Sequence, residues 1–299
     1  MTRHIISIGD FDRRQIDRLL DNAKRIDAQK YDKNALMGKI LATLFFEPST
    51  RTRMSFEAAM ARFGGTSISV GSVEACSIAK GETLADTIRV VSGYADAIVI
   101  RHPKEGAARL AAQFASVPVI NAGDGAGQHP SQTLLDLYTI RQSMKLDGIN
   151  VALIGDLRYG RTAHSLASAL SLYHVHLHTV SPKGLELPTS LHSDLSEKGM
   201  EITEHDNIKD LITNVDVIYV TRIQRERFPD SASYFNVASS YRITPELLKD
   251  AKKQAIVLHP LPRVDEIDPR VDLLSHAKYF EQSKNGVPVR MAMLLQVLQ

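Results

Sequence analysis

Apolar and polar residues alternate along the chain in two recurring patterns. Short apolar runs, such as residues 39–46, 97–100 and 151–155, have the length and composition of buried parallel strands. Between these runs, apolar positions return every three or four residues, which is the spacing of an amphipathic helix. Strands that alternate with helices predict right-handed crossover connections and mainly parallel sheets. The pattern therefore predicts an α/β protein.

Capping residues, glycines and prolines mark the ends of these elements. Helices are predicted over residues 10–28, with Asp10 as the N-cap, and over 49–63, 84–94, 106–115, 131–144, 161–172 and 289–298. Strands are predicted over residues 39–46, 66–70, 97–100, 117–120, 151–155, 175–180, 215–221 and 255–258. We predict one domain over residues 1–144 and a second over 145–285, with the C-terminal helix, 286–299, packing back on the first.

The composition excludes several classes of protein. The 299 residues hold 36 Lys and Arg against 34 Asp and Glu, a net charge of +2, so the chain lacks the charge of a polyanion-binding protein. The single cysteine, Cys76, cannot form an internal disulfide, and no apolar run approaches the roughly 20 residues of a membrane span. Residues 1–10 lack the apolar core of a signal peptide. We expect a cytoplasmic protein with a small-molecule partner, and neither nucleic acid nor membrane as partner.

The polar turn after the first predicted strand is the most informative segment. Ser49, Thr50, Arg51 and Thr52 stand at a helix start, where unpaired amides and the helix dipole favour an anion. Hydroxyl and guanidinium groups at such a place suit a phosphate dianion. Alternatively, Ser49 or Thr50 caps the helix and Arg51 faces solvent. Capping alone does not explain an arginine in the first helical turn, where a cation opposes the dipole.

Further polar groups follow other predicted strands, at the edge where open parallel sheets bind ligands. They are Arg101, His129, Gln132, Arg161, the segment 221–227 and the segment 259–263. Each is also compatible with an ordinary surface loop or strand end. The two prolines of 259–263 favour a rigid turn whose fixed carbonyls suit a ligand amide.

Several catalytic and cofactor motifs are missing. No set of Cys and His accompanies Cys76 at the spacing of a zinc site, and no Gly-x-Ser-x-Gly or Walker pattern occurs. Gly155 and Gly160 miss the spacing of a dinucleotide motif. We therefore expect neither a metal nor a cofactor. An anion site, several arginines and no nucleophile indicate group transfer between two anionic substrates, by positioning and electrostatics.

Eight short segments occur in a fixed order along the chain. They are FFEPSTRTR at 45–53, KGETLAD at 80–86, RHP at 101–103, NAGDG at 121–125, HPSQ at 129–132, GDLRYGRT at 155–162, TRIQ at 221–224 and HPLPRVDEI at 259–267. This ordered set resembles the aspartate/ornithine carbamoyltransferase family over essentially the whole chain. Ornithine-specific members carry a Cys in a His-Cys-Leu-Pro segment, whereas this chain has Pro260 there. The resemblance therefore implies transfer of the carbamoyl group of carbamoyl phosphate to the α-amine of L-aspartate.

The resemblance also implies a role for individual residues. Contacts to carbamoyl phosphate fall on Ser49, Thr50, Arg51, Thr52, Arg101, His129, Gln132, Ser77 and Lys80, the last two from a neighbouring subunit. Contacts to aspartate fall on Lys80, Arg161, Arg222, Gln224, Pro260 and Leu261. The residues implied to act in catalysis are Arg51, Thr52, Lys80, Arg101 and His129.

An assembly follows from the same resemblance. It implies a homotrimer whose active sites lie in the cleft between two domains and at the subunit interface, with residues 1–144 binding carbamoyl phosphate and 145–285 binding aspartate. It also implies a step early in pyrimidine biosynthesis and allows association with regulatory chains. Two alternatives stay open: a carbamoyltransferase for another amine such as ornithine, and a non-catalytic anion-binding protein of the same fold. Turnover of carbamoyl phosphate with aspartate separates them.

Overall fold

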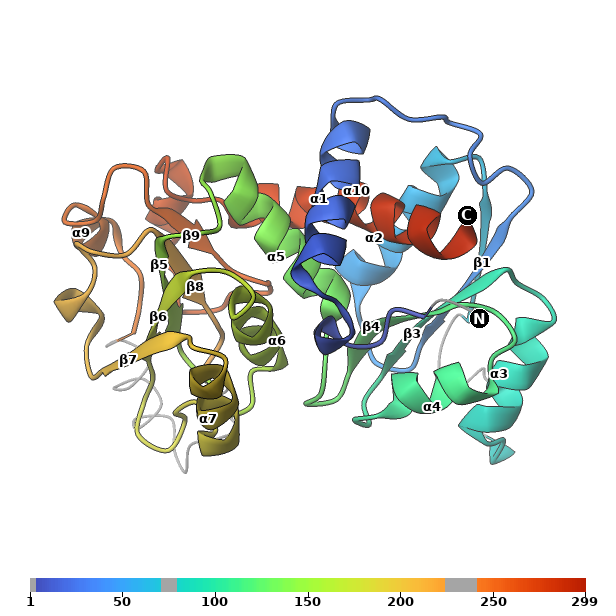
Figure 1. Ribbon diagram of the computed structural model, residues 1–299, viewed down its shortest axis with the longest axis horizontal. Coiled ribbons are helices and arrows are strands. Elements are labelled where there is room, and N and C mark those ends of the chain that lie inside the picture. Colours follow the sequence, from blue (N-terminus) through green and yellow to red (C-terminus); the bar gives the residue numbers. More distant parts are fainter. Residues whose placement is uncertain (1–3, 71–79, 224–240) are drawn as a thin grey trace. The chain divides into compact units, whose positions relative to one another are not determined.

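The chain forms two compact units. The computed structural model describes residues 4–70, 80–223 and 241–299. Unit 1 consists of Met1–Tyr138 with Lys284–Gln299, and unit 2 consists of Thr139–Ser283. Each unit contains one parallel sheet with helices packed against it (Figure 1). The predicted architecture of two domains with helix-flanked parallel sheets is confirmed.

Unit 1 has a four-stranded parallel sheet in the order β2-β1-β3-β4. Its strands are β1 (Ile40–Phe45), β2 (Thr66–Ser69), β3 (Ala97–His102) and β4 (Val119–Asp124). The helices that lie wholly or partly in this unit are α1 (Arg13–Asp27), α2 (Thr50–Arg62), α3 (Leu84–Ser92), α4 (Ala107–Phe114), α5 (Pro130–Ser143) and α10 (Tyr279–Leu298). Helices α3 and α4 lie on one side of the sheet, and α1, α2 and α10 lie on the other (Figure 1).

Alternate residues of the strands build the core of unit 1. Leu44 of β1 and Ile98 of β3 belong to one buried cluster together with Ile88 of α3 and Ala111 of α4. Because helices cover the central strands on both faces, the strands are apolar along most of their length. This burial fixes their register, and with it the position of the residues that follow each strand.

Unit 2 has a five-stranded parallel sheet in the order β7-β6-β5-β8-β9. Its strands are β5 (Ile149–Ile154), β6 (Val175–Val180), β7 (Glu201–His205), β8 (Val217–Val220) and β9 (Ile256–Leu258). Its helices are α6 (Arg161–Leu170), α7 (Thr189–Glu197) and α9 (Pro245–Leu248). Among the helices in the described part of the chain, none combines the length and the apolar composition that crossing a membrane requires.

Several boundaries differ from those predicted. The N-cap of α1 is Asp12, not Asp10, because Asp12 accepts a hydrogen bond from the amide of Gln15, whose side chain in turn accepts from the Asp12 amide. The last helix begins at Tyr279 rather than at residue 289, and Pro288 lies inside it. A proline at this position normally argues against a helix interior, which explains the late predicted start.

Candidate active site

The predicted binding residues of unit 1 stand at one edge of its sheet. Strands β1, β3 and β4 are neighbours and run parallel, so the residues that follow their carboxyl ends come together. Ser49 to Thr52 follow β1 and open α2, and Arg101 lies in β3 opposite Phe45 of β1. His129 and Gln132 come after β4, at the start of α5. The topology therefore brings together the chemistry that the sequence places at three separate strand ends.

The first turn of α2 is not capped by its own side chains. Ser49 is the N-cap residue, but its hydroxyl makes no capping hydrogen bond, and the first turn contains no acidic residue. By contrast, Asp12 caps α1 and Thr83 caps α3 through hydrogen bonds to backbone amides. Ser49 thus occupies the N-cap position that the alternative predicts and Arg51 faces solvent, but the capping hydrogen bond that the alternative expects is not formed. Backbone amides at a helix start that receive no capping hydrogen bond are of the kind that can bind an anion.

The two arginines of this turn have different surroundings. The Nε atom of Arg53 lies 3.6 Å from Oε1 of Glu57, one turn further along α2. Arg51 is exposed, and it forms no ion pair with the part of the chain that the structure describes. A cation in the first turn opposes the helix dipole unless an anion offsets it. Of these two arginines, Arg51 is thus the one without an acidic partner among the described residues.

Arg101 links the ends of three strands. Its guanidinium donates from Nη1 to the carbonyl oxygen of Ala122 in β4, at 3.2 Å, and its Nη2 lies 3.3 Å from Oε1 of Glu47, just after β1. The side chain is only 11% exposed, so this pair is held in a fixed place. Sequence analysis did not single out Glu47, although its position between a buried strand and Pro48 was a signal.

A hydrogen-bonded loop carries the chain from β4 to α5. The Asp124 carboxylate accepts from the amides of Gln128, at 2.8 Å, and of Gly106, at 3.0 Å. Asn121 donates to Oδ1 of Asp124 at 3.0 Å. A side chain at Gly125 would meet the carbonyl oxygen of Pro103 at 2.6 Å, and its φ of 53° also favours glycine. These contacts set the loop that ends at His129.

His129 and Gln132 are both buried, at 4% and 8% exposure. The Nδ1 atom of His129 lies 3.5 Å from the hydroxyl of Ser131. The side-chain amide of Gln132 donates to Oδ1 of Asp136 at 2.8 Å. Side chains held in this way present a fixed pattern of donors and acceptors to a ligand.

Of the three remaining predicted residues, the structure describes only one. Lys80 is exposed at the beginning of the segment that leads to α3. Ser77 and Gln224 lie outside the described residues.

Unit 2 repeats the arrangement with a different set of strands. Arg161 is the first residue of α6 after β5, Arg222 follows β8, and Pro260 and Leu261 follow β9. Strands β5, β8 and β9 are neighbours in the sheet, so these residues share its carboxyl edge. At the first of these strand ends, a Cβ on Gly155 would meet the carbonyl oxygen of Thr221 at 2.5 Å, so a glycine is required for this close approach.

The turn after β9 is held by buried hydrogen bonds. His259 accepts at Nδ1 from the amide of Leu261 and donates from Nε2 to Oε1 of Glu266, each at 2.8 Å. Glu266 also accepts from the amides of Val264 and Asp265, at 3.0 and 2.9 Å. Burial pushes the pKa of Glu266 upward, but the hydrogen bonds from His259 and from the backbone outweigh it, and the pKa is lowered.

Leu261 adopts a positive φ of 56°, which is uncommon for a residue with a side chain. The conformation turns the Pro260 and Leu261 backbone sharply at the edge of the sheet. Local strain of this kind persists where surrounding contacts impose it, and the His259 hydrogen bond is such a contact.

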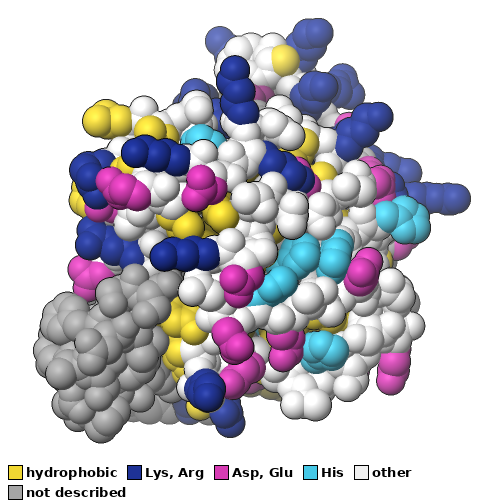
Figure 2. Space-filling view, turned by 90° about the vertical axis from the view of Figure 1, so that its left-hand side faces the viewer, with side chains coloured by type: hydrophobic (Ala, Val, Ile, Leu, Met, Phe, Trp, Pro, Cys, Tyr) yellow, Lys and Arg dark blue, Asp and Glu magenta, His cyan; other side chains and the backbone are white. Residues whose placement is uncertain are grey.

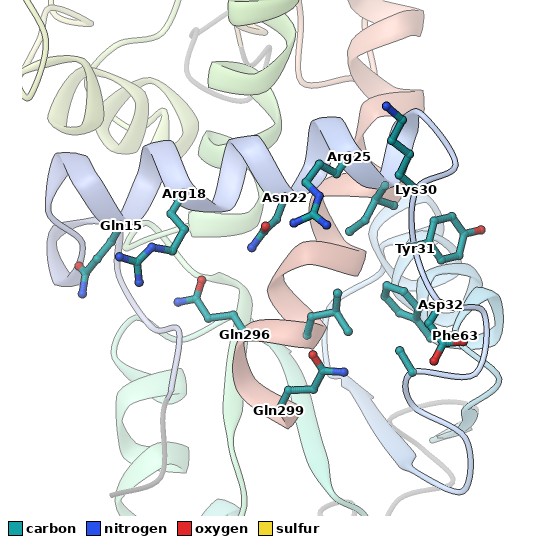
Figure 3. A pocket seen from close by; sticks show the side chains of 13 residues that line it. Gln15, Arg18, Asn22, Arg25, Lys30, Tyr31, Asp32, Phe63, Gln296 and Gln299 are labelled. Carbon is teal, nitrogen blue, oxygen red and sulfur yellow. The ribbon is translucent and has the colours of Figure 1, made fainter.

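Two polar surface features lie apart from these residues. The first is a groove of about 470 Å³ in unit 1, between α1 and the end of α10. Arg18, Asn22 and Arg25 of α1 point toward Gln296 of α10 and Gln299, which follows this helix (Figure 3). None of the predicted active-site residues that the structure describes lines this groove.

The second feature is a histidine cluster in unit 2. Histidine side chains gather on the face shown in Figure 2, and β6 and β7 supply three that contact one another. The Nδ1 atom of His178 lies 3.0 Å from Nε2 of His205, and its ring lies 4.1 Å from that of His176. Within residues 4–70, 80–223 and 241–299, no group of three His, Cys, Asp or Glu side chains has the geometry to hold a metal ion.

Two family models match the parts of the chain that contain the two sheets. A model of the aspartate/ornithine carbamoyltransferase carbamoyl-P binding domain matches residues 3–142. A model of the Asp/Orn binding domain of the same family matches residues 147–297. The chain belongs to the aspartate/ornithine carbamoyltransferase family. The uncapped start of α2 thus lies within the part of the chain that matches the family's carbamoyl-P binding domain.

Similar members of the family share nearly the full length of this chain. The aspartate carbamoyltransferase catalytic subunit of Methanosphaerula palustris is 72% identical over 296 residues, which cover 99% of each chain. The catalytic subunit of M. jannaschii aspartate transcarbamoylase superposes with a TM-score of 0.93 at 53% identity, covering 99% of this chain and 97% of that one. The Trypanosoma cruzi enzyme in complex with N-(phosphonacetyl)-L-aspartic acid has a TM-score of 0.93 at 41% identity, covering 100% and 96%.

Proposed function

We infer that the chain is an aspartate carbamoyltransferase. It transfers the carbamoyl group of carbamoyl phosphate to the α-amine of L-aspartate, with N-carbamoyl-L-aspartate and phosphate as products. The observation that carries this conclusion is 72% identity to an aspartate carbamoyltransferase catalytic subunit over 99% of both chains. The anion-directed start of α2 supports it independently.

Carbamoyl phosphate is assigned to the sheet edge of unit 1. Ser49, Thr50, Arg51 and Thr52 bind its phosphate, because amides, hydroxyls and a guanidinium without an acidic partner among the described residues lie together there. Arg101, His129 and Gln132 hold the carbamoyl group. Lys80 and Ser77 join this site from a neighbouring subunit.

Aspartate is assigned to the corresponding edge of unit 2. The guanidinium groups of Arg161 and Arg222 bind its two carboxylates, since planar forks suit carboxylate oxygens. Gln224 and Lys80 also contact aspartate. The backbone of Pro260 and Leu261, held by His259, contributes polar groups of fixed direction.

The reaction needs no protein nucleophile. The neutral α-amine of aspartate attacks the carbamoyl carbon, and a C–N bond forms while the carbonyl oxygen becomes an oxyanion. Thr52, Arg101 and His129 donate hydrogen bonds to this oxygen and lower the barrier. The C–O bond to phosphate then breaks, and the leaving phosphate accepts the proton that the amine releases. His129 acts as a neutral donor in this scheme.

We also propose the wider organisation that accompanies this activity. Residues 1–144, with the helix 286–299, form the carbamoyl-phosphate-binding domain, and residues 145–285 form the aspartate-binding domain. The chain forms a homotrimer with shared active sites and works in the cytoplasm at an early step of pyrimidine biosynthesis, and the family resemblance allows association with regulatory chains. The role of Lys80 and Ser77 depends on this trimer.

One assay tests the activity directly. The purified chain is incubated with carbamoyl phosphate and either L-aspartate or L-ornithine, and ureido product and phosphate are measured. We expect product with aspartate and none with ornithine. Product with ornithine would overturn the assignment of Arg222, Gln224 and Pro260. A chain that binds carbamoyl phosphate without turnover of either amine would instead be a non-catalytic anion-binding protein.

A further inference from the structure

The orientation of the Gln132 side chain is set by a buried carboxylate. Nε2 of Gln132 lies 2.8 Å from Oδ1 of Asp136, one helical turn along α5, and the two residues are 8% and 0% exposed. The oxygen and nitrogen of an amide are hard to tell apart by shape, but a carboxylate can only accept hydrogen bonds. The NH₂ group of Gln132 must therefore face Asp136, and its Oε1 is the end left for a ligand.

A buried arginine keeps Asp136 an acceptor. Arg290 of α10 is 3% exposed, and its guanidinium lies 5.1 Å from the ring centre of Phe56 in α2. Burial lowers the pKa of Arg290 to about 10, while the charge of Asp136 acts to raise it. The positive charge of Arg290 therefore favours an oxygen over an amide NH₂ group at position 136.

The space around this arginine is tightly defined. A Cβ added to Gly286 would meet Nη1 of Arg290 at 2.1 Å and the side chain of Leu135 at 3.4 Å. A glycine one turn before Arg290 on α10 thus leaves room for the guanidinium beside α5. Arg290 is fixed among α2, α5 and α10, and it supplies the positive charge that a buried carboxylate such as Asp136 requires.

We propose that Asp136 is a positioning residue that aims Oε1 of Gln132 at the amine of the carbamoyl group, and so makes the site prefer carbamoyl phosphate to acetyl phosphate. This inference rests on the proposed function. The two acyl phosphates have nearly the same shape. The carbamoyl group carries two N–H donors where the acetyl group carries a methyl group. A hydrogen-bond acceptor at this place therefore stabilises bound carbamoyl phosphate but not bound acetyl phosphate.

The substitution Asp136→Asn makes a specific prediction from the same geometry. The positive charge of Arg290 attracts the oxygen of the new side chain and repels its NH₂ group, so the NH₂ group turns toward Gln132. Gln132 then turns its oxygen toward Asn at position 136 and presents its own NH₂ to the substrate. The NH₂ group of Gln132 would then face the NH₂ group of carbamoyl phosphate, and two donors cannot form a hydrogen bond. Binding of acetyl phosphate, which has a methyl group there, would change little.

The test compares two ligands on the full-length chain. We expect Asp136→Asn to lower kcat/KM for carbamoyl phosphate by about 10- to 100-fold, and to change the competitive inhibition constant of acetyl phosphate by less than about twofold. The conservative variant Asp136→Glu, which keeps a carboxylate, should retain more of the preference. An equal loss for both ligands would overturn the inference, because it would show general damage to the site.

A second variant keeps the test decisive if Asp136→Asn fails to fold. Gln132→Met removes the acceptor at similar size, and we expect it to abolish the preference without weakening acetyl phosphate. In the Gln132→Met background, Asp136→Asn should change the preference no further, which a double-mutant cycle measures. An additive effect would contradict action through Gln132. If the wild-type chain shows no turnover, the proposed function fails, and competition binding of the two acyl phosphates still tests the positioning role.

Discussion

The ring of His259 joins the end of β9 to the backbone amide of Leu261 through a 2.8 Å hydrogen bond to Nδ1. Because Nδ1 accepts, the proton of the neutral ring sits on Nε2, from which it is donated to Glu266. One side chain thus fixes a turn of positive φ and satisfies a buried carboxylate. The backbone groups assigned to aspartate depend on this ring, although the ring is not assigned a contact with aspartate.

His259→Ala should therefore impair the use of aspartate. We expect kcat/KM for aspartate to fall by about 10- to 100-fold, because the turn loses the contact that holds it and a small displacement of binding groups is costly. The Michaelis constant for carbamoyl phosphate, measured in the same steady-state assay, should change less than about threefold. His174→Ala, at an exposed histidine of the same unit, is the control. Equal losses for both substrates would argue for general destabilisation.

Arg51 and Arg53 offer a matched pair for the phosphate site. Arg51→Gln removes the charge that has no acidic partner among the described residues, and we expect kcat/KM for carbamoyl phosphate to fall about 100- to 1000-fold. Arg53→Gln removes an equal charge two residues away, but this charge is already offset by Glu57, so its effect should stay within about threefold. Similar losses in both variants would show that only the net charge of the turn matters.

His129→Ala should lower turnover more than it weakens binding of carbamoyl phosphate. The arginines carry most of the charge that binds the phosphate, whereas His129 donates to the oxygen that becomes charged in the reaction. We expect kcat to fall by about 100-fold, with the dissociation constant of carbamoyl phosphate raised less than about fivefold in equilibrium binding. An unchanged kcat would remove His129 from the mechanism.

Shared active sites would allow two inactive chains to rescue each other. Arg51→Ala damages the phosphate site of its own subunit, and Lys80→Ala damages the site of its neighbour. After dissociation and reassembly of a mixture, hybrid trimers should contain some intact sites and regain part of the activity, measured as phosphate release. Failure to regain activity after mass spectrometry has shown mixed trimers would contradict a site completed across subunits.

The histidine cluster of unit 2 should make stability depend on pH. Burial first, and then the neighbouring His176 and His205, lower the pKa of His178 from 6.5 to about 4. Between these two values the unfolded chain binds a proton that folded His178 excludes, so the free energy of unfolding falls as pH falls through this range. The loss should be on the order of 1–3 kcal/mol.

Thermal unfolding between pH 8 and 5 tests this expectation. The melting temperature of His178→Gln should vary less with pH than that of the wild-type chain. His174→Gln, which removes an exposed histidine of the same unit, should follow the wild type. The same pH dependence in all three proteins would assign the effect to other groups.

The sequence pattern predicted most strands because buried parallel strands are short apolar runs. It did not reveal β7, whose residues Glu201–His205 contain a single apolar side chain at a half-exposed sheet edge, or α9, which spans only Pro245–Leu248. Neither element has enough apolar residues to show a period. The late start predicted for α10 had the opposite cause, since Pro288 is accommodated inside a helix that surrounding packing holds.

The sequence predicted the polar groups that follow the strands, but not the contacts that hold them in place. Hydroxyl and guanidinium groups after β1 were visible in the sequence, and so was their place at a helix start. The contacts that hold the site were not, because Glu47 meets Arg101 only through the pairing of neighbouring strands, and the i, i+4 spacing of Gln132 and Asp136 on α5 does not by itself show that the two side chains are buried and hydrogen-bonded. Ser77 and Gln224 lie outside the described residues, so their assignment rests on the family resemblance alone.

The uncapped start of α2 has a consequence for the protein without its substrate. Helices α1 and α3 complete their first turns with side chains of the chain itself, whereas the first turn of α2 leaves that task to a bound phosphate. In our assignment, the phosphate of carbamoyl phosphate accepts the hydrogen bonds of the first-turn amides and so stabilises this end of α2 only while the substrate is bound. The order of this one helical turn then depends on whether carbamoyl phosphate is bound.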